Sequence, residues 1–251
     1  GEYIGEHVLE GVTTFLARYA PEELPASSAQ SQNKPIVEPV TDLSETVPAR
    51  PPSFCTGCPE RPLFAAMKMV QQERGPLQVA GDIGCHLFGS LAPFEIGGTT
   101  MGYGLGPASN AAFDGGGSQR TVSIIGDGGF WHNGLTSSVG NAVFNKSDGV
   151  IVVVDNFYSA ATGGQDVPSS RAENRSKSTR HPISAAVKGI GVEWVREVDD
   201  TYDVAAMRDT LQAALDTDHE GPKVIVASSE CMLNRQRREQ PVRDRAIAAG
   251  A

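Results

Sequence analysis

The sequence predicts an α/β fold, a three-layer sandwich in which helices cover both faces of a mostly parallel central sheet. Short β-branched runs bounded by glycine or aspartate alternate with stretches of helical periodicity, and this alternation is typical of a parallel sheet. The run IVVVD at residues 151–155 is apolar on both faces, as expected of a central strand that helices cover. Ligands of such sheets bind at the carboxyl ends of the strands.

The elements follow one another in a simple order. Residues 1–19 space their apolar side chains as a helix does, and residues 20–52, with seven of the sixteen prolines, indicate a linker or wrapping arm. A compact domain is expected over residues 53–235 and an exposed tail over 236–251. Within the domain, strands are expected at residues 77–80, 121–125, 150–154, 194–198 and 224–227. Helices are expected at about residues 61–73, 101–113, 132–145, 183–190 and 203–216.

Charge and hydropathy exclude some classes of partner. Acidic residues outnumber basic ones by 30 to 21 over 251 residues, and this acidic balance argues against a nucleic-acid binder. No run approaches the length of about 18 apolar residues that a membrane-spanning helix needs. The first 30 residues show no basic-then-apolar leader. We therefore expect a cytoplasmic protein without a membrane partner.

Gly126-Asp127-Gly128 directly follows a predicted strand, and Asn156 ends the next apolar strand. Adjacent parallel strands would bring Asp127 and Asn156 to one edge of the sheet, where their oxygens suit Mg²⁺. Glycines 126, 128 and 129 let the backbone approach a diphosphate, and the N-terminus of the following helix favours its charge. A plain strand-to-helix turn explains the tripeptide alone; the asparagine at this spacing favours a site for a cation and a diphosphate.

The four cysteines are too few for a disulfide framework. Cys55-x-x-Cys58 alone is typical of a redox pair, of half a zinc site or of no site at all. Cys85 and Cys231 stand alone, which suits a structural zinc site less well, since such a site usually pairs two short motifs. An iron–sulfur cluster draws ligands from distant loops. A cluster, a zinc site and unligated thiols all stay open on the residues alone.

The Gly-Asp-Gly…Asn spacing resembles the thiamine-diphosphate signature, and further stretches narrow the resemblance. They look like successive blocks of the α subunits of indolepyruvate:ferredoxin oxidoreductases and, more broadly, of 2-oxoacid:ferredoxin oxidoreductases, over about residues 50–235. The resemblance implies the diphosphate-binding domain of the thiamine-diphosphate-binding fold. The blocks are RPPSFCTGCPERPLF, GDIGCHLFG, TTMGYGLG, GDGGFWHNGL and DNFYSAATGGQ.

The resemblance implies roles for individual residues. Mg²⁺ would be held by Asp127, Asn156 and the backbone carbonyl of Tyr158, and a [4Fe–4S] cluster by Cys55, Cys58, Cys85 and Cys231. His86 would face the substrate carboxylate or the thiazolium, and His132 would bond a phosphate oxygen; an ordinary structural donor is the alternative for both. Met101 would prop the cofactor ring, unless it only packs a helix. The remaining contacts to thiamine diphosphate would come from Gly84, Cys85, His86, Gly102, Gly126, Gly128, Gly129, Thr162 and Gly163.

The resemblance also implies an activity, namely oxidative decarboxylation of an aryl-2-oxoacid, with coenzyme A accepting the acyl group and ferredoxin the electrons. The glutamate that activates the aminopyrimidine comes, in the resembling families, from a separate pyrimidine-binding domain or subunit. We therefore expect an oligomeric assembly and an incomplete chain. Two alternatives stay open: a non-oxidative thiamine-diphosphate enzyme, such as a 2-oxoacid decarboxylase or carboligase, and a non-catalytic, metal-stabilised electron-transfer module.

Overall fold

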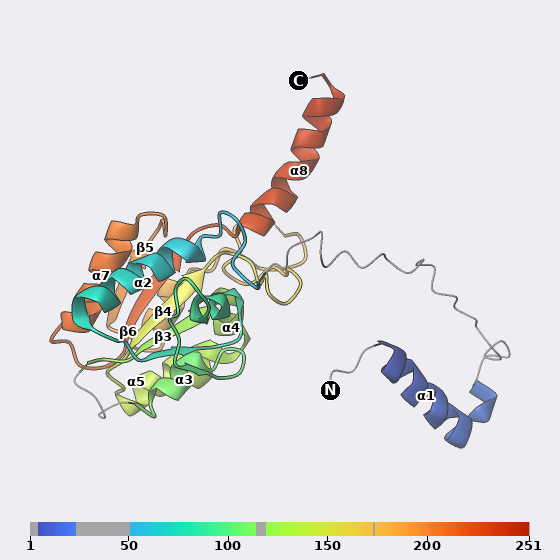
Figure 1. Cartoon of the computed structure of the whole chain (residues 1–251), viewed down its shortest axis with the longest axis horizontal. Coiled ribbons are helices and arrows are strands. Elements are labelled where there is room, and N and C mark those ends of the chain that lie inside the picture. The colour runs from blue at the N-terminus through green and yellow to red at the C-terminus, as the bar shows by residue number, and fades with distance from the viewer. Residues whose placement is uncertain (1–4, 24–50, 114–118, 173, 251) are drawn as a thin grey trace. The chain divides into compact units, whose positions relative to one another are not determined.

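The computed structural model describes residues 5–23, 51–113, 119–172 and 174–250 (Figure 1). The chain divides into two compact units, residues 1–51 and 52–251, which are described separately. In the first unit, α1 (Gly5–Tyr19) is followed by a 3-10 turn, η1 (Pro21–Glu23). The linker or arm predicted over 20–52 lies largely outside the described residues. No helix in the described ranges is long and apolar enough to cross a bilayer.

The second unit is built on a six-stranded sheet in the order β2-β1-β3-β4-β6-β5. Every neighbouring pair is parallel, which confirms the predicted sheet. The short edge strand β2 has only two residues, too few for an apolar pattern, and was not among the predicted strands. The strands are β1 (Val79–Gly81), β2 (Thr99–Thr100), β3 (Val122–Gly126), β4 (Val150–Asp155), β5 (Trp194–Val198) and β6 (Lys223–Ser228).

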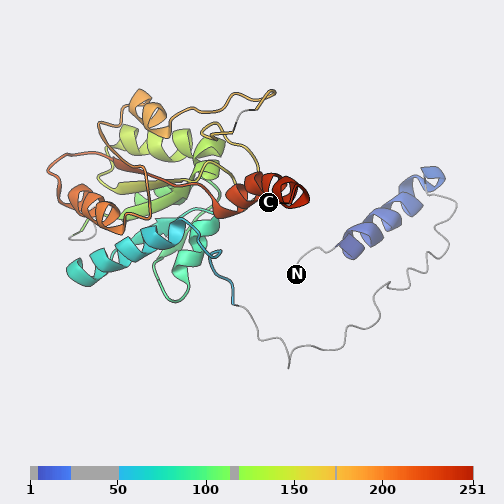
Figure 2. The same ribbon diagram turned by 90° about the horizontal axis from the view of Figure 1, so that it is seen from above.

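Helices cover both faces of this sheet, so the predicted three-layer sandwich is confirmed (Figure 2). On β4, Val150, Val152 and Val154 join the apolar cluster with α2 (Glu60–Arg74) and α7 (Val204–Asp216). Ile151 and Val153 point the other way, because successive side chains of a strand alternate between faces. The second face carries α3 (Gly106–Asn110), η3 (Phe130–Gly140), α5 (Asn141–Asn145) and α6 (Ile183–Gly189).

Three predicted boundaries differ from the structure. The helix expected over 101–113 is reduced to α3, because Gly104 has a φ of +82° that a right-handed helix cannot contain. The helix expected over 132–145 begins earlier, where α4 (Asp127–Gly129) continues directly into η3, which is π-helical. The charged residues expected as an exposed tail belong to α8 (Met232–Ala248), and its side chains from Gln240 onward are exposed.

A cluster of four aromatic rings holds the N-terminal edge of the second unit together. Phe54 is buried, and its ring centroid lies 5.4 Å from that of Phe64, 5.8 Å from Phe88 and 5.9 Å from Phe94. Phe88 belongs to the 3-10 helix η2 (Cys85–Ser90). The aromatic cluster therefore packs the segment that carries Cys55 against the helix that begins at Cys85.

Substitution Phe54→Ala should destabilise the fold, because it removes a buried ring from this cluster. We expect the free energy of unfolding to fall by about 3–5 kcal/mol in urea denaturation. Phe144, whose side chain is 84% exposed on α5, provides the matched control. Phe144→Ala should change the free energy of unfolding by less than about 0.5 kcal/mol. Equal losses for the two variants would contradict the role given to the aromatic cluster.

Candidate functional site

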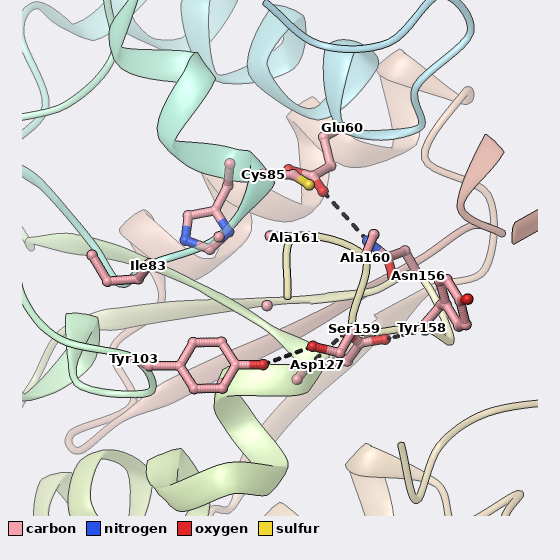
Figure 3. Close-up of a pocket in the computed structure, with 15 residues that line it drawn as sticks. Glu60, Ile83, Cys85, Tyr103, Asp127, Asn156, Tyr158, Ser159, Ala160 and Ala161 are labelled. Carbon is pink, nitrogen blue, oxygen red and sulfur yellow. Dashed lines mark hydrogen bonds between the residues drawn. The ribbon is translucent and has the colours of Figure 1, made fainter. Parts of the chain in front are cut away.

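A pocket lies at the carboxyl ends of β1, β3 and β4 (Figure 3). The chain runs from β1 to one side of the sheet and then returns to the other side through β3, so the strand order reverses here. Such a reversal opens a crevice between the loops that leave neighbouring strands, and ligands of open α/β sheets bind there. The pocket is lined by Glu60, Ile83, Gly84, Cys85, His86, Tyr103, Gly126, Asp127, Gly128, Gly129, Asn156, Tyr158, Ser159, Ala160 and Ala161.

Strand register places Asp127 beside the end of β4. Gly126 pairs with Val154, so Asp127 and Asn156 leave adjacent strands at the same edge and both line the pocket. The backbone N–H of Tyr158 donates to Asp127 Oδ2 over 3.0 Å, and that of Gly128 donates to Oδ1 over 2.7 Å. The carboxylate of Asp127 is thereby fixed by both loops. Asp127 and Asn156 therefore lie at one edge of the sheet, as expected.

The chemistry of this pair suits a cation. Burial is the main cause that raises the pKa of Asp127 to about 8, and the negative charge of Asp155 adds to it. The backbone hydrogen bonds from Tyr158 and Gly128 lower this pKa, but by less. Asn156 is buried, and its Oδ1 has no hydrogen-bond partner. A buried acceptor without a partner is costly, and a bound cation would relieve both this oxygen and the disfavoured charge of Asp127.

Glycines bring the backbone close to the pocket. A Cβ atom at Gly128 would lie 2.2 Å from Tyr103 Oη and 2.5 Å from Ser159 Oγ, and one at Gly129 would lie 2.1 Å from Asp82 Oδ2. Side chains therefore do not fit at either position. Because α4, η3 and α5 form one continuous helical stretch from Asp127 to Asn145, the N-terminus of this stretch lies at the pocket, where its dipole favours an anion.

A buried aspartate that the sequence analysis missed organises three loops of the pocket. Asp82 is fully buried, and its Oδ1 lies 2.6 Å from His86 Nε2. The backbone N–H of Gly104 donates to Oδ2 over 2.7 Å, and that of Gly126 donates to Oδ1 over 3.4 Å. Burial lowers the pKa of His86, but the hydrogen bond and charge of Asp82 outweigh burial and raise it. His86 is thus held by Asp82 with its ring beside the pocket.

A pair of hydroxyl groups spans the pocket above Gly128. Tyr103 Oη and Ser159 Oγ lie 2.8 Å apart (Figure 3). Ser159 Oγ also lies 2.8 Å from Thr162 Oγ1. Glu60 also lines the pocket and was missed, as were Ile83, Ala160 and Ala161. All of these residues occur within the sequence blocks that carried the resemblance. Their residue types alone gave no further signal, because only the fold brings them into one cavity.

Several predicted cofactor residues do not line the pocket. Met101 is 47% exposed, and Gly102 is exposed beside it. His132 is exposed, and its ring centroid lies 5.2 Å from that of Tyr103. Thr162 and Gly163 are exposed in the loop after Tyr158. The structure brings the other predicted cofactor residues to the pocket, and the roles of these five stay predictions.

The four cysteines occupy one neighbourhood, and all are free thiols. Burial comes first among the causes that raise the pKa of Cys58 and of Cys85 to about 12, and both groups also interact electrostatically with Cys55. Cys85 interacts in the same way with Cys231. Cys231 donates its backbone N–H to Asn156 O over 3.1 Å, which ties the last cysteine to the end of β4.

The donor sets fit the two implied centres differently. The oxygen donors at Asp127 and Asn156 fit a hard cation, as their burial and the unpartnered Oδ1 indicate. The thiols fit a four-thiolate centre in number, chemical type and neighbourhood. Over the described ranges, however, no three His, Cys, Asp or Glu side chains are already grouped as a metal ion needs.

Comparisons with known proteins agree with this geometry. The chain is 34% identical over 247 residues to "Indolepyruvate oxidoreductase subunit IorA" of Thermococcus kodakarensis, which covers 92% of this chain and 36% of that subunit. It is 31% identical over 234 residues to the subunit of the same name of Methanothermobacter thermautotrophicus, with 90% and 37% covered. The predicted resemblance to these α subunits is confirmed, and the chain spans little more than a third of their length.

A solved structure supports the fold. The 2-oxoglutarate:ferredoxin oxidoreductase of Magnetococcus marinus, determined with 2-oxoglutarate, coenzyme A and succinyl-CoA bound, superposes with a TM-score of 0.60 at 17% identity. The match covers 72% of this chain and 65% of that one. The family described as "Thiamine pyrophosphate enzyme, C-terminal TPP binding domain" matches residues 82–227, which begin directly after β1, include β3 and β4, and hold every residue that lines the pocket except Glu60. With more than half of its length in that match, this chain belongs to the C-terminal TPP-binding domain family of thiamine pyrophosphate enzymes.

Proposed function

We propose that this chain binds thiamine diphosphate and Mg²⁺ as part of a 2-oxoacid:ferredoxin oxidoreductase. The observation that carries the proposal is the buried pair at the ends of β3 and β4, Asp127 and the unpartnered Oδ1 of Asn156, beside Gly128 and Gly129, where side chains do not fit. This arrangement offers oxygen ligands to a cation and backbone N–H groups to a diphosphate at adjoining positions.

Each group of the pocket has a defined task in this proposal. Asp127, Asn156 and the backbone carbonyl of Tyr158 hold Mg²⁺, and glycines 126, 128 and 129 admit the diphosphate oxygens. His86, fixed by Asp82 at 2.6 Å, orients its ring toward the substrate side of the pocket. When bound, thiamine diphosphate supplies the electron sink for loss of carbon dioxide from a 2-oxoacid.

The cysteines extend the proposal to an oxidative reaction. Cys55, Cys58, Cys85 and Cys231 would hold a [4Fe–4S] cluster, and Cys85 also lines the cofactor pocket. Such a cluster supplies one-electron transfer when bound. Its place beside the pocket gives electrons from the decarboxylated substrate a short way out toward ferredoxin. A non-oxidative decarboxylase or carboligase has no use for four free thiols at this position.

The remaining parts of the reaction belong to a larger assembly. The relatives are named subunits and are about three times longer than this chain, which covers 36% of the first. We therefore propose that a pyrimidine-binding domain or subunit supplies the activating glutamate. The oligomeric assembly would work in the cytoplasm, with an aryl-2-oxoacid such as indolepyruvate and coenzyme A as its substrates and ferredoxin as its electron acceptor.

Substitution Asp127→Asn tests the cation site, since it retains the side-chain volume and removes the charge. Loss of a residue that only hydrogen-bonds to a metal ligand weakens metal binding about 10–100-fold. Asp127→Asn changes a ligand itself, so it should weaken the Mg²⁺-dependent binding of thiamine diphosphate at least as much. Calorimetric titration measures this affinity. Asp209→Asn, which removes a carboxylate that is 68% exposed on α7, is the control and should bind as the wild type does. Undiminished binding by Asp127→Asn would remove the basis of the proposed function.

Substitution Gly128→Ala tests the close approach of the backbone. The added methyl group meets Tyr103 Oη and Ser159 Oγ, and overpacking of about 1–3 kcal/mol corresponds to a loss of about 5- to 150-fold in affinity for thiamine diphosphate. At Gly189, on α6, an added Cβ meets nothing within 4 Å. Gly189→Ala should therefore leave the affinity unchanged. Equal affinities of the two variants would show that the turn does not contact the cofactor.

Anaerobic purification tests the cluster. The wild type should contain iron and acid-labile sulfide in equal amounts, and Cys231→Ser should lose both, because a four-thiolate cluster needs each ligand. Metal and sulfide analysis checks this expectation, with zinc measured on the same samples. Retention of zinc in place of iron, or the absence of both metals from the wild type, would rule out the proposed electron path.

A further inference from the structure

Glu60 is a buried carboxyl group that the proposed function does not yet use. It is the first residue of α2, two positions after Cys58, and only 2% of its surface is exposed. Glu60 and Asp127 are the two carboxyl groups among the described residues that line the pocket. A buried carboxyl group needs partners for both of its oxygens, and the partners of Glu60 indicate its role.

One oxygen of Glu60 decides how the amide of Asn156 is oriented. Asn156 Nδ2 donates to Glu60 Oε1 over 3.4 Å, which leaves Asn156 Oδ1 as the end of the amide without a partner (Figure 3). A reversed amide would set Oδ1 against the carboxyl oxygen, acceptor against acceptor. Glu60 therefore selects the orientation in which Oδ1, the only atom of this amide that can bind a cation, stays available for one.

The second oxygen of Glu60 has no partner. Glu60 Oε2 and Asn156 Oδ1 are both buried acceptors without a hydrogen bond, on contacting side chains that line one pocket. Two such oxygens on contacting side chains need a cation, a donor or both. Mg²⁺ brings both, since it keeps several of its water molecules when it binds to one or two protein ligands. The other polar side chains of this wall are engaged: His86 with Asp82, and Tyr103 with Ser159.

We propose that Glu60 is the positioning residue of the Mg²⁺ site. Its Oε1 holds the amide of Asn156 with Oδ1 toward the cation, and its Oε2 accepts a hydrogen bond from a water molecule bound to that cation. The inference rests on the proposed function, because it assigns an outer partner to the cation that accompanies the diphosphate. Outer partners of this kind fix the orientation of the ligands and raise the affinity for the metal.

The test measures thiamine diphosphate binding by calorimetry at a series of Mg²⁺ concentrations, on the full-length protein. Glu60→Ala should raise the half-saturating Mg²⁺ concentration about 10–100-fold while binding at saturating Mg²⁺ is retained. Glu60→Gln, which retains one acceptor oxygen, should lie between Glu60→Ala and the wild type. A general loss of structure would weaken binding at every Mg²⁺ concentration, so the shift along the Mg²⁺ axis is specific to a positioning role.

Glu197→Gln, at an exposed carboxylate on β5, is the control for the change of charge and should follow the wild-type curve. Circular dichroism melting identifies a variant that does not fold. If Glu60→Ala does not fold, the Mg²⁺ dependence of Glu60→Gln is compared with that of the wild type instead. Wild-type Mg²⁺ dependence of the folded Glu60 variants would overturn the inference and leave the proposed function standing. A wild-type protein that binds no thiamine diphosphate at any Mg²⁺ concentration would overturn both.

Discussion

The pocket depends on one buried carboxylate. Asp82 joins the loop after β1, the turn at Gly104 and the end of β3 through His86 Nε2 and two backbone N–H groups, all within 3.4 Å of its side-chain oxygens. The three loops come from different parts of the chain. A fully buried charge with three donors is stable only when all three donors are in place, so Asp82 couples the positions of the three loops to one another.

The sequence was sufficient where periodicity and strand order carry the information. The strand β4 is apolar on both faces, and this pattern, together with the alternation of strands and helices, predicted the parallel sheet. Adjacent parallel strands then bring Asp127 and Asn156 to one edge of the sheet. Contacts between distant segments could not be predicted in this way. Tyr103 and Glu60 are ordinary polar residues in sequence, and only the packing of α2 and of the loop after β2 brings them to the pocket. Likewise, glycines 128 and 129 indicated a turn, whereas both are helical.

The cysteine neighbourhood and the cation pocket share their structural supports. Asn156 accepts the backbone N–H of Cys231 with its carbonyl oxygen and donates its side-chain amide to Glu60, and Glu60 follows Cys58 by two residues. Cys85 belongs to both sites, since it lines the pocket and interacts electrostatically with the other three cysteines. The proposed cluster and the proposed cofactor would thereby be held on one shared frame of residues.

This shared frame has a consequence for the permitted length of the chain. Residues 55–60 connect two thiols to a carboxyl group, and the last of them begins α2. One residue inserted after Cys58 would lie outside the helix, so it would displace both thiols from Glu60, whose position is fixed because Leu63, Phe64 and Met67 anchor α2 in the core. The segment from Cys55 to Glu60 therefore sets the spacing between the thiols and the carboxyl group: exposed Thr56 can vary, whereas Gly57 has a φ of +71° that favours glycine, and the number of residues is fixed.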